Sequence, residues 1–305
     1  MTPQSPFVSS GEPAAFIIPG IGLYYADLIE SLSANPVFQN RCEIAGIGHL
    51  LLDMGRTLED TLDVQKTSYA VNCTLCDLLH SKGIFPEITV GYSMGIYAAL
   101  YAGGYYTYET GLKIVEKAFL LTRGICDSHT VEYAMAVLMG LTEKDIHEIV
   151  FKSQKAFGDI AVYNGKHHFV IVGEKDVIEN GIRRARDEGA FGAIQIFTRH
   201  PYHSQILYGI SDDFLSFLSS LCYTLPTAKT LSPINGDIIT LENLQHTINS
   251  AMFTPLRFDM TVHKMVTDFG IFRCYEAGPV QSMKKLIRYI NKNIKVISPC
   301  KDIMS

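Results

Sequence analysis

Apolar positions in the first hundred residues form two kinds of run, short continuous ones and longer ones with helical spacing. Ala14–Ile18 is a continuous apolar run that ends at a Pro-Gly pair, and residues 88–90 form a second one. Between them, residues 68–82 place apolar side chains three and four positions apart, and residues 96–100 form another helix-compatible stretch. Continuous short runs are typical of parallel strands buried on both faces, and the spacing of three and four indicates helices. The order predicts βαβ units in a doubly wound parallel sheet.

Residues 131–198 have a different pattern, which predicts strands and helices in the order β-α-β-β-α-β. This is the order of a ferredoxin-like unit. The expected strands cover residues 134–139, 159–163, 169–172 and 193–197, and the expected helices cover 142–154, opened by a Thr142 cap, and 175–188. Asn164-Gly165, between the two middle strands, is typical of a hairpin turn. The sequence therefore predicts a small subdomain at 131–198, inserted into a large one formed by residues 1–130 and 199–305.

One short motif lies between the second predicted strand and the helix after it: Gly91-Tyr92-Ser93-Met94-Gly95. A G-x-S-x-G turn at such a junction needs glycine at both ends because side chains there would clash. It exposes the serine oxygen at the carboxyl end of the strand, where the N-terminus of the helix favours negative charge. The pattern predicts a nucleophile, Ser93. The alternative is a chance arrangement of two glycines around a serine.

A nucleophilic serine needs a base, and the chain has ten histidines. Most of them stand in helical or loop stretches with no neighbouring feature that would hold them at a site. His203 follows the point where the inserted subdomain returns to the larger one, and this position makes it the expected base. The turn after the first strand, Pro19-Gly20-Ile21-Gly22, should lie beside the serine turn, since both end neighbouring parallel strands.

Composition narrows the function classes. The net charge is −5, the signs are mixed and Trp is absent, so nothing indicates a nucleic-acid partner. No apolar run reaches 18 residues and the polar start lacks the pattern of a signal peptide, so we expect no membrane segment and a soluble, cytoplasmic protein. Seven scattered cysteines suit reduced thiols, and the one CxxC, Cys73 and Cys76, lies in a helical stretch without a second pair. We expect core cysteines, no metal and no bound cofactor.

Five motifs in this chain share their order and spacing with one known family. They are Pro19-Gly20-Ile21-Gly22-Leu23, Gly91-Tyr92-Ser93-Met94-Gly95, His200-Pro201-Tyr202-His203, Thr254-Pro255-Leu256-Arg257-Phe258 and Tyr275-Glu276-Ala277-Gly278-Pro279. They resemble motifs of the malonyl-CoA:acyl-carrier-protein transacylases and of the acyltransferase domains of polyketide synthases, over nearly the whole chain. The resemblance implies an α/β fold, a hydrolase-like parallel sheet body with an inserted ferredoxin-like small subdomain.

The resemblance also implies roles for individual residues. Ser93 would take the acyl group from a thioester as an oxygen ester, with His203 as general base and later general acid. The backbone N–H groups of Ile21 and Met94 would form the oxyanion hole, and the main-chain carbonyl of Arg257 would orient the histidine. The residues expected at the acyl pocket are Tyr92, Ala118, Asn164 and Tyr202, of which Asn164 is equally explained as the turn residue before Gly165.

Departures from the family pattern concern the acyl group. Malonyl-selective members place an arginine 25 positions after the nucleophile to pair with the substrate carboxylate, and this chain has Ala118 there. Arg123 would point to another face of the helix. Tyr92, Ile96 and Ile21 replace the family's usual histidine, glutamate and glutamine. A carboxylate buried without a partner would cost several kcal/mol. The sequence therefore predicts a monocarboxylic acyl group: acetyl, propionyl or a longer or branched chain.

Two reactions fit these residues. In the first, the acyl group passes from a coenzyme A or carrier thioester through Ser93 to the phosphopantetheine thiol of an acyl carrier protein, in polyketide or fatty-acid biosynthesis. In the second, water takes the acyl group, and the protein is an editing hydrolase for the carrier proteins of a polyketide assembly line. Water access would decide between them. Lys284, Lys285 and Arg288 are candidates for docking the carrier protein, or they form a solvated helix face.

Overall fold

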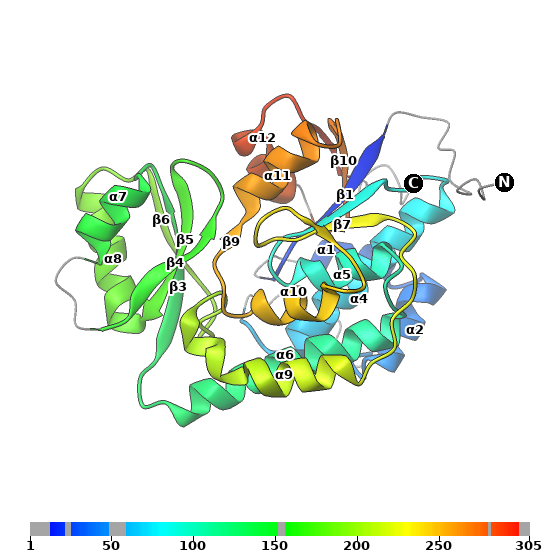
Figure 1. The fold of residues 1–305 in the computed structure, drawn as a ribbon, viewed down its shortest axis with the longest axis horizontal. Helices are drawn as coiled ribbons and strands as arrows, with labels where there is room; N and C mark the ends of the chain where they lie inside the picture. Colours follow the sequence, from blue (N-terminus) through cyan, green and yellow to red (C-terminus); the bar gives the residue numbers. More distant parts are fainter. Residues whose placement is uncertain (1–12, 22–25, 49–58, 152–155, 280–281, 299–305) are drawn as a thin grey trace.

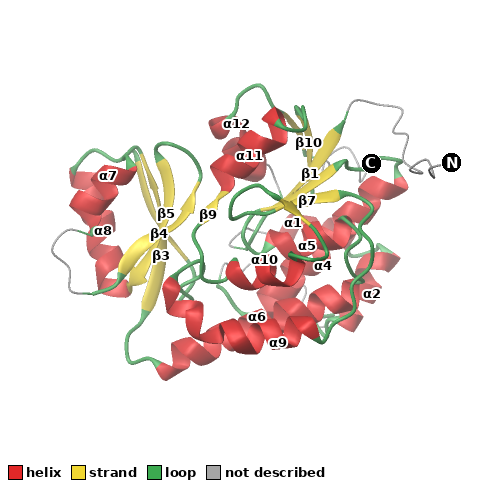
Figure 2. Cartoon of the chain, in the orientation of Figure 1, coloured by secondary structure: helices red, strands yellow, loops and turns green. Residues whose placement is uncertain are grey.

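The chain forms two β-sheets with helices around them (Figures 1 and 2). The computed structural model describes residues 13–21, 26–48, 59–151, 156–279 and 282–298. The larger sheet and most helices lie at the right of Figure 1, and the smaller sheet lies at the left with α7 and α8. The long helix α6 (Tyr108–Ser128) leads the chain from the larger part to the smaller one.

The larger sheet has six strands within the described residues, in the order β11-β10-β1-β2-β7-β8. Neighbouring strands are parallel from β11 to β7, and β8 runs antiparallel to β7. The strands are β1 (Ala14–Ile18), β2 (Ile88–Gly91), β7 (Lys229–Leu231), β8 (Ile238–Ile239), β10 (Arg273–Glu276) and β11 (Lys295–Ile297). Every position of β1 is buried, which explains its continuous apolar run. The predicted parallel sheet is confirmed.

Alternate residues of β1 face two different cores, because side chains along a strand point to opposite faces. Phe16 and Ile18 belong to one core, and Ala15 and Ile17 belong to the other. The first core is covered by α1 (Ala26–Leu32), α2 (Pro36–Ile44), α4 (Leu62–Ser81), α5 (Gly95–Ala102), α6, α9 (Ser211–Ser219) and α10 (Leu244–Ser250), and the second by α11 (Phe258–Thr267) and α12 (Ser282–Ile290). The helix predicted over residues 68–82 is confirmed by α4, which begins earlier, at Leu62, and ends at Ser81.

The smaller sheet confirms the predicted order of elements. Its strands are β3 (Tyr133–Met139), β4 (Gly158–Tyr163), β5 (His168–Glu174) and β6 (Gly192–Ile196), with α8 (Lys175–Asp187) before the last. They lie in the order β6-β3-β5-β4 and pair antiparallel, as in a ferredoxin-like unit. Asn164 and Gly165 lie in the turn that joins β4 to β5, and Gly165 adopts a φ of 137°.

The first helix of this unit is shorter than predicted. It begins at the predicted Thr142 cap, where Thr142 and Asp145 form a capping box. After α7 (Glu143–Asp145) the chain makes one wide π turn, η1 (Ile146–Val150), which places Val150 against Gly181 of α8. Residues 152–154, the predicted end of this helix, lie outside the described residues, as do Gly22 and Leu23 of the first motif.

A two-residue strand from the later part of the chain joins the smaller sheet. β9 (Leu256–Arg257) pairs parallel with Val162 and Tyr163 of β4. Residues that follow position 199 therefore contribute to the sheet of the inserted unit, and β9 lies between the two sheets in Figure 2. The division of the chain at residues 131 and 198 stays a prediction.

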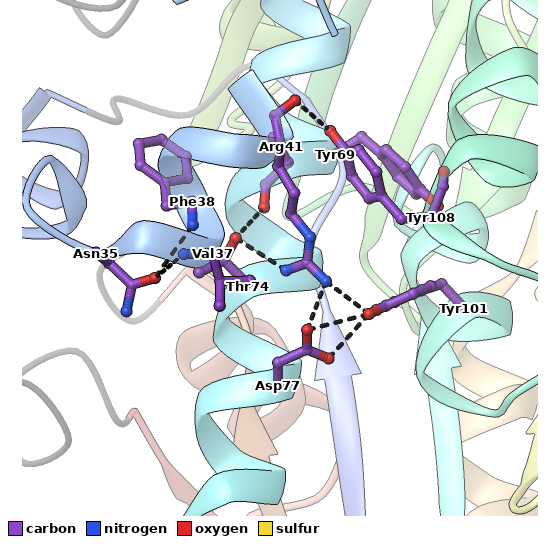
Figure 3. A network of polar contacts seen from close by, with 10 residues as sticks. Asn35, Val37, Phe38, Arg41, Tyr69, Thr74, Asp77, Tyr101 and Tyr108 are labelled. Carbon is purple, nitrogen blue, oxygen red and sulfur yellow. Dashed lines mark hydrogen bonds and ion pairs between the residues drawn. The ribbon is translucent and has the colours of Figure 1, made fainter. Parts of the chain in front are cut away.

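A buried arginine connects four helices of the larger part (Figure 3). Arg41 of α2, 5% exposed, forms an ion pair with Asp77 and donates to Thr74 Oγ1, both on α4, and to the hydroxyl of Tyr101 on α5. Its guanidinium lies 5.2 Å from the ring centroid of Tyr101 and 5.0 Å from that of Tyr108 on α6. The contacts hold α4, α5 and α6 together, and these helices carry residues near the serine turn.

Replacing Arg41 by alanine should lower stability, because it leaves Asp77 without its cation and removes stacking on two aromatic rings. Since Asp77 is 35% exposed, we expect a loss of about 2 kcal/mol, below the usual cost of breaking a fully buried pair. Urea unfolding followed by circular dichroism measures it. Arg41→Lys keeps the charge but not the planar fork and should lose less. A change within about 0.5 kcal/mol for Arg41→Ala would show that the cluster contributes little.

Candidate active site

The serine turn joins β2 to α5 as predicted, and its two glycines are required by close backbone contacts. A Cβ placed at Gly91 would lie 2.3 Å from the backbone of Ile96, and one at Gly95 would lie 2.3 Å from the carbonyl oxygen of Ile18. Ser93 between them adopts a φ of 53°, a left-handed backbone conformation that residues other than glycine rarely take. The tight turn therefore places Ser93 at the carboxyl end of β2.

Ser93 and His203 are in direct contact. Ser93 Oγ lies 2.8 Å from His203 Nε2, although 110 positions separate the two residues in the chain. His203 is buried and also has a positive φ, 59°. Ser93 and His203 are the only non-glycine residues with a positive φ in the described part of the chain. Backbone strain of this kind persists where the surrounding structure enforces it, and it gathers at functional sites.

The backbone of the segment after α10 holds His203. Its Nδ1 lies 2.6 Å from the carbonyl oxygen of Ala251, and its backbone N–H donates to Met252 O at 2.8 Å. The prediction that Arg257 supplies the orienting carbonyl is wrong, because the carbonyl that meets His203 Nδ1 is that of Ala251. Arg257 O instead lies 3.1 Å from Thr261 Oγ1 in α11. Burial lowers the pKa of His203 to about 4, against an upward effect of the Ala251 carbonyl. The imidazole is therefore neutral near pH 7.

The turn after β1 lies against the serine turn, as expected. Tyr92 N donates to Ile18 O at 2.9 Å, and a Cβ at Gly20 would lie 3.2 Å from Ser93 Cβ and 3.7 Å from the backbone nitrogen of Met94. Asn72 Nδ2 on α4 supports the turn by donating to Pro19 O at 3.1 Å. Ile21 and Met94 both line the cavity at Ser93, which brings together the two residues expected at the oxyanion hole.

A cavity of about 30 Å³ adjoins Ser93 and His203, enough for about two water molecules. Ala118 and Tyr202 line it, as expected for the acyl pocket. Its other lining residues are Ile21, Gln65, Met94, Ile96, Tyr97, Phe119, Pro233, Ala251, Met252 and Leu256. None of these described residues is an arginine or lysine. Arg123, the nearest alternative in sequence, is exposed and lies outside this lining.

Tyr92 and Asn164 do not line this cavity, which corrects their assignment to the pocket. Asn164 Nδ2 donates to the Tyr92 hydroxyl at 3.1 Å, and the Tyr92 ring meets Phe258 edge to face at 4.9 Å. Tyr92 therefore packs against the core on the α11 side, whereas Ser93 lines the cavity. Asn164 Oδ1 is buried without a hydrogen bond to any described residue.

Sequence reasoning missed a polar network behind the cavity. Asp60, whose side chain is 2% exposed, accepts from Gln65 Nε2 at 2.8 Å, from Thr198 Oγ1 at 2.7 Å and from His200 Nδ1 at 2.7 Å. Gln65 Nε2 also donates to the Tyr202 hydroxyl at 2.8 Å. The only sequence signal for this network is that His200 lies three positions before the expected base, His203.

Other predicted features lie away from Ser93. Cys73 and Cys76 are buried in α4 as predicted, and Cys300 lies outside the described residues. Lys284, Lys285 and Arg288 lie on α12, which contacts the β4–β5 turn region through Tyr289 and His168. No group of three His, Cys, Asp or Glu side chains among the described residues could hold a metal ion. None of the helices in the described residues combines the length and the hydropathy of a membrane-spanning segment.

Comparison with known proteins agrees with this geometry. The chain is 22% identical over 244 residues to the malonyl CoA-acyl carrier protein transacylase of Bacillus subtilis (strain 168), which covers 78% of this chain and 75% of that one. It is 25% identical over 297 residues to the polyketide biosynthesis protein ThaF of Burkholderia thailandensis, covering 94% of this chain but only 25% of that longer protein.

Solved structures of the same kind share the fold. The malonyl CoA-acyl carrier protein transacylase of Coxiella burnetii superposes with a TM-score of 0.84 at 21% identity, with 96% of both chains covered. A malonyl-transacylase in complex with its type II PKS acyl-carrier protein superposes with a TM-score of 0.82 at 22% identity, over 93% of this chain and 95% of that one. The sequence profile described as "Acyl transferase domain" matches residues 25–270. The chain therefore belongs to the acyl transferase domain family.

Proposed function

We propose that the protein is an acyltransferase that moves an acyl group from a coenzyme A or carrier thioester, through an ester on Ser93, to the phosphopantetheine thiol of an acyl carrier protein. The observation that carries this proposal is the 2.8 Å contact between Ser93 Oγ and the neutral, buried His203 Nε2. A serine alone is a weak nucleophile, and an adjacent base within hydrogen-bond distance activates it.

In the first half-reaction, Ser93 Oγ attacks the thioester carbonyl and His203 Nε2 takes the hydroxyl proton. His203 can accept at Nε2 because its Nδ1–H donates to the Ala251 carbonyl, which fixes the tautomer. The backbone N–H groups of Ile21 and Met94 are the proposed donors to the oxyanion. The carbon–sulfur bond then breaks, the thiol leaves with the proton from His203, and the acyl group stays on Ser93.

In the second half-reaction, the carrier thiol gives its proton to His203 and attacks the ester carbonyl, and Ser93 leaves with that proton. No carboxylate needs to assist, since the Ala251 carbonyl already orients the imidazole. If water enters in place of the thiol, the same residues catalyse hydrolysis, so the editing hydrolase is the alternative outcome of the same site.

The acyl group that fits the cavity is small and uncharged. The family resemblance aligns Ala118 with the arginine of malonyl-selective members, and the described lining offers no cation to pair with a carboxylate. The apolar side chains of Ile96, Phe119 and Leu256 suit an alkyl group. The curated relatives named as malonyl transacylases are only 22–24% identical to this chain, over 70–75% of their own length, so their substrate is not carried over to this chain.

The proposed partner is an acyl carrier protein, as in the complex of the related malonyl-transacylase. Carrier proteins of this kind are acidic, and Lys285 and Arg288 are exposed on α12 beside the β4–β5 turn. These residues are the proposed basic contacts. The phosphopantetheine arm and coenzyme A enter as parts of the substrates, not as resident cofactors.

Mixing the protein with acetyl- or propionyl-coenzyme A should give an acyl adduct by intact-mass spectrometry, and adding a holo carrier protein should move the acyl group to the carrier. Ser93→Ala should abolish the adduct. Cys222→Ser is the matched control, because Cys222 is an exposed thiol that could be acylated without catalysis. Release of free acid without a lasting adduct would identify the hydrolase. An adduct that survives Ser93→Ala would overturn the proposed nucleophile.

The rate of Ser93 acylation should stay constant from pH 8 down to about pH 5 and fall below it, because His203 accepts a proton only when neutral and its pKa is lowered to about 4. Rapid quenching and mass spectrometry of a single turnover with acetyl-coenzyme A measures the profile. Circular dichroism at each pH controls for unfolding. A midpoint near the ordinary histidine value of about 6.5 would contradict the buried, neutral state of His203.

Ala118→Arg should raise the acylation rate with malonyl-coenzyme A relative to acetyl-coenzyme A by about tenfold or more, because a charge-assisted hydrogen bond contributes about 1.5–3 kcal/mol. Ala118→Leu fills the same space without charge and should slow both substrates without favouring malonyl. If wild-type protein already prefers malonyl-coenzyme A, the proposed neutral acyl group is wrong.

A further inference from the structure

Asp60 controls how one side chain of the acyl cavity is oriented. Its buried carboxylate accepts hydrogen bonds from Gln65, Thr198 and His200, with donor distances of 2.7–2.8 Å. An ionised carboxylate can only accept hydrogen bonds. The atom of the Gln65 amide that faces Asp60 Oδ1 must therefore be the nitrogen, which settles the choice between the two orientations of the amide.

This orientation occupies both N–H groups of Gln65. One donates to Asp60 Oδ1 and the other to the Tyr202 hydroxyl, each at 2.8 Å. The amide oxygen, Oε1, has no hydrogen-bond partner among the described residues. Gln65 is only 3% exposed and lines the cavity beside Ser93. A bound acyl group can therefore meet only Oε1 of this amide, and Oε1 is a hydrogen-bond acceptor.

The other polar side chains of the cavity are already engaged. The Tyr97 hydroxyl donates to Met252 Sδ at 3.4 Å, and Ser93 and His203 contact each other. The Tyr202 hydroxyl accepts from Gln65 and lies 3.4 Å from His200 Nδ1. A polar atom left without a partner in a closed site is costly, so a ligand that satisfies it gains affinity over one that does not.

We propose that Gln65, fixed by Asp60, is a specificity-determining residue that selects acyl groups bearing a hydroxyl over their alkyl analogues and rejects acyl groups bearing a carboxylate. The inference rests on the proposed acylation of Ser93 and narrows its substrate class to short hydroxyacyl thioesters. A hydroxyl donates its proton to Gln65 Oε1. A carboxylate has no proton to donate at neutral pH, and it would lie near both Oε1 and the Asp60 carboxylate.

Pairs of thioesters with the same shape test the proposal. Glycolyl- and propionyl-coenzyme A differ by a hydroxyl in place of a methyl group, as do 3-hydroxypropionyl- and butyryl-coenzyme A. Both pairs are used because they place the hydroxyl at two distances from the ester carbon. Rates of Ser93 acylation by mass spectrometry should favour the hydroxyacyl member of at least one pair by about threefold or more in wild-type protein.

Gln65→Met keeps the length of the side chain but removes the acceptor, and it should reverse that preference to favour the alkyl member by about tenfold, since the hydroxyl then loses its partner. Tyr202→Phe is the matched control: Asp60 still holds the Gln65 amide, so the ratio of the two rates should stay on the hydroxyacyl side. The ratio is the readout, so a general loss of rate in either variant does not confuse the result.

The outcomes separate this inference from the proposed function. Equal or alkyl-favouring rates for both pairs in wild-type protein, with acyl-Ser93 formed, overturn the role of Gln65 and leave the acyltransferase intact, even if the Gln65 variant does not fold. An unchanged preference in folded Gln65→Met also overturns it. Failure of all four thioesters to acylate Ser93 would instead count against the proposed function.

Discussion

The contact between Ser93 Oγ and His203 Nε2 is the constraint that the structure around it has to satisfy, because both residues hold left-handed backbones. Strain of this kind costs about 1–3 kcal/mol for each residue and has to be offset by the surroundings. At Ser93, Gly91 and Gly95 let β1, β2 and α5 approach closely. At His203, the backbone of Ala251 and Met252 binds both the ring and the main chain. The larger sheet supplies the first set of contacts, and the segment after α10 supplies the second.

The parts of this arrangement that the sequence predicts are local. A parallel strand buried on both faces needs apolar residues at every position, so β1 is visible in five consecutive letters. The serine turn is visible because its glycines are imposed by neighbours within a few residues or on the adjacent strand. The inserted unit is visible because strand and helix patterns alternate in a recognised order. The prediction for its first helix is too long, since a cap such as Thr142 marks where a helix begins but carries no information on where it ends.

The parts that the sequence does not predict come from contacts between distant segments. Any carbonyl in the loop from 251 to 257 could have faced His203, and only the path of the chain between α10 and β9 selects Ala251 over Arg257. The sequence places Tyr92 at the pocket because it precedes the nucleophile, yet its ring packs against Phe258 and its hydroxyl accepts from Asn164, both distant in the chain. The Asp60 network joins residues up to 140 positions apart, and no periodicity or motif records such a pairing.

Two features of the cavity, one from the sequence and one from the structure, concern which acyl group it selects. Ala118 is read from the sequence as a missing cation, and Gln65 is read from the structure as an acceptor whose orientation Asp60 imposes. A missing cation alone would leave a cavity that favours alkyl over hydroxyalkyl chains, because apolar walls impose the cost of burying the hydroxyl without a partner. An acceptor fixed at Gln65 Oε1 makes burial of the hydroxyl favourable instead of costly. Substrate choice at this site would then follow from the direction of one amide, held by a carboxylate that the substrate does not touch.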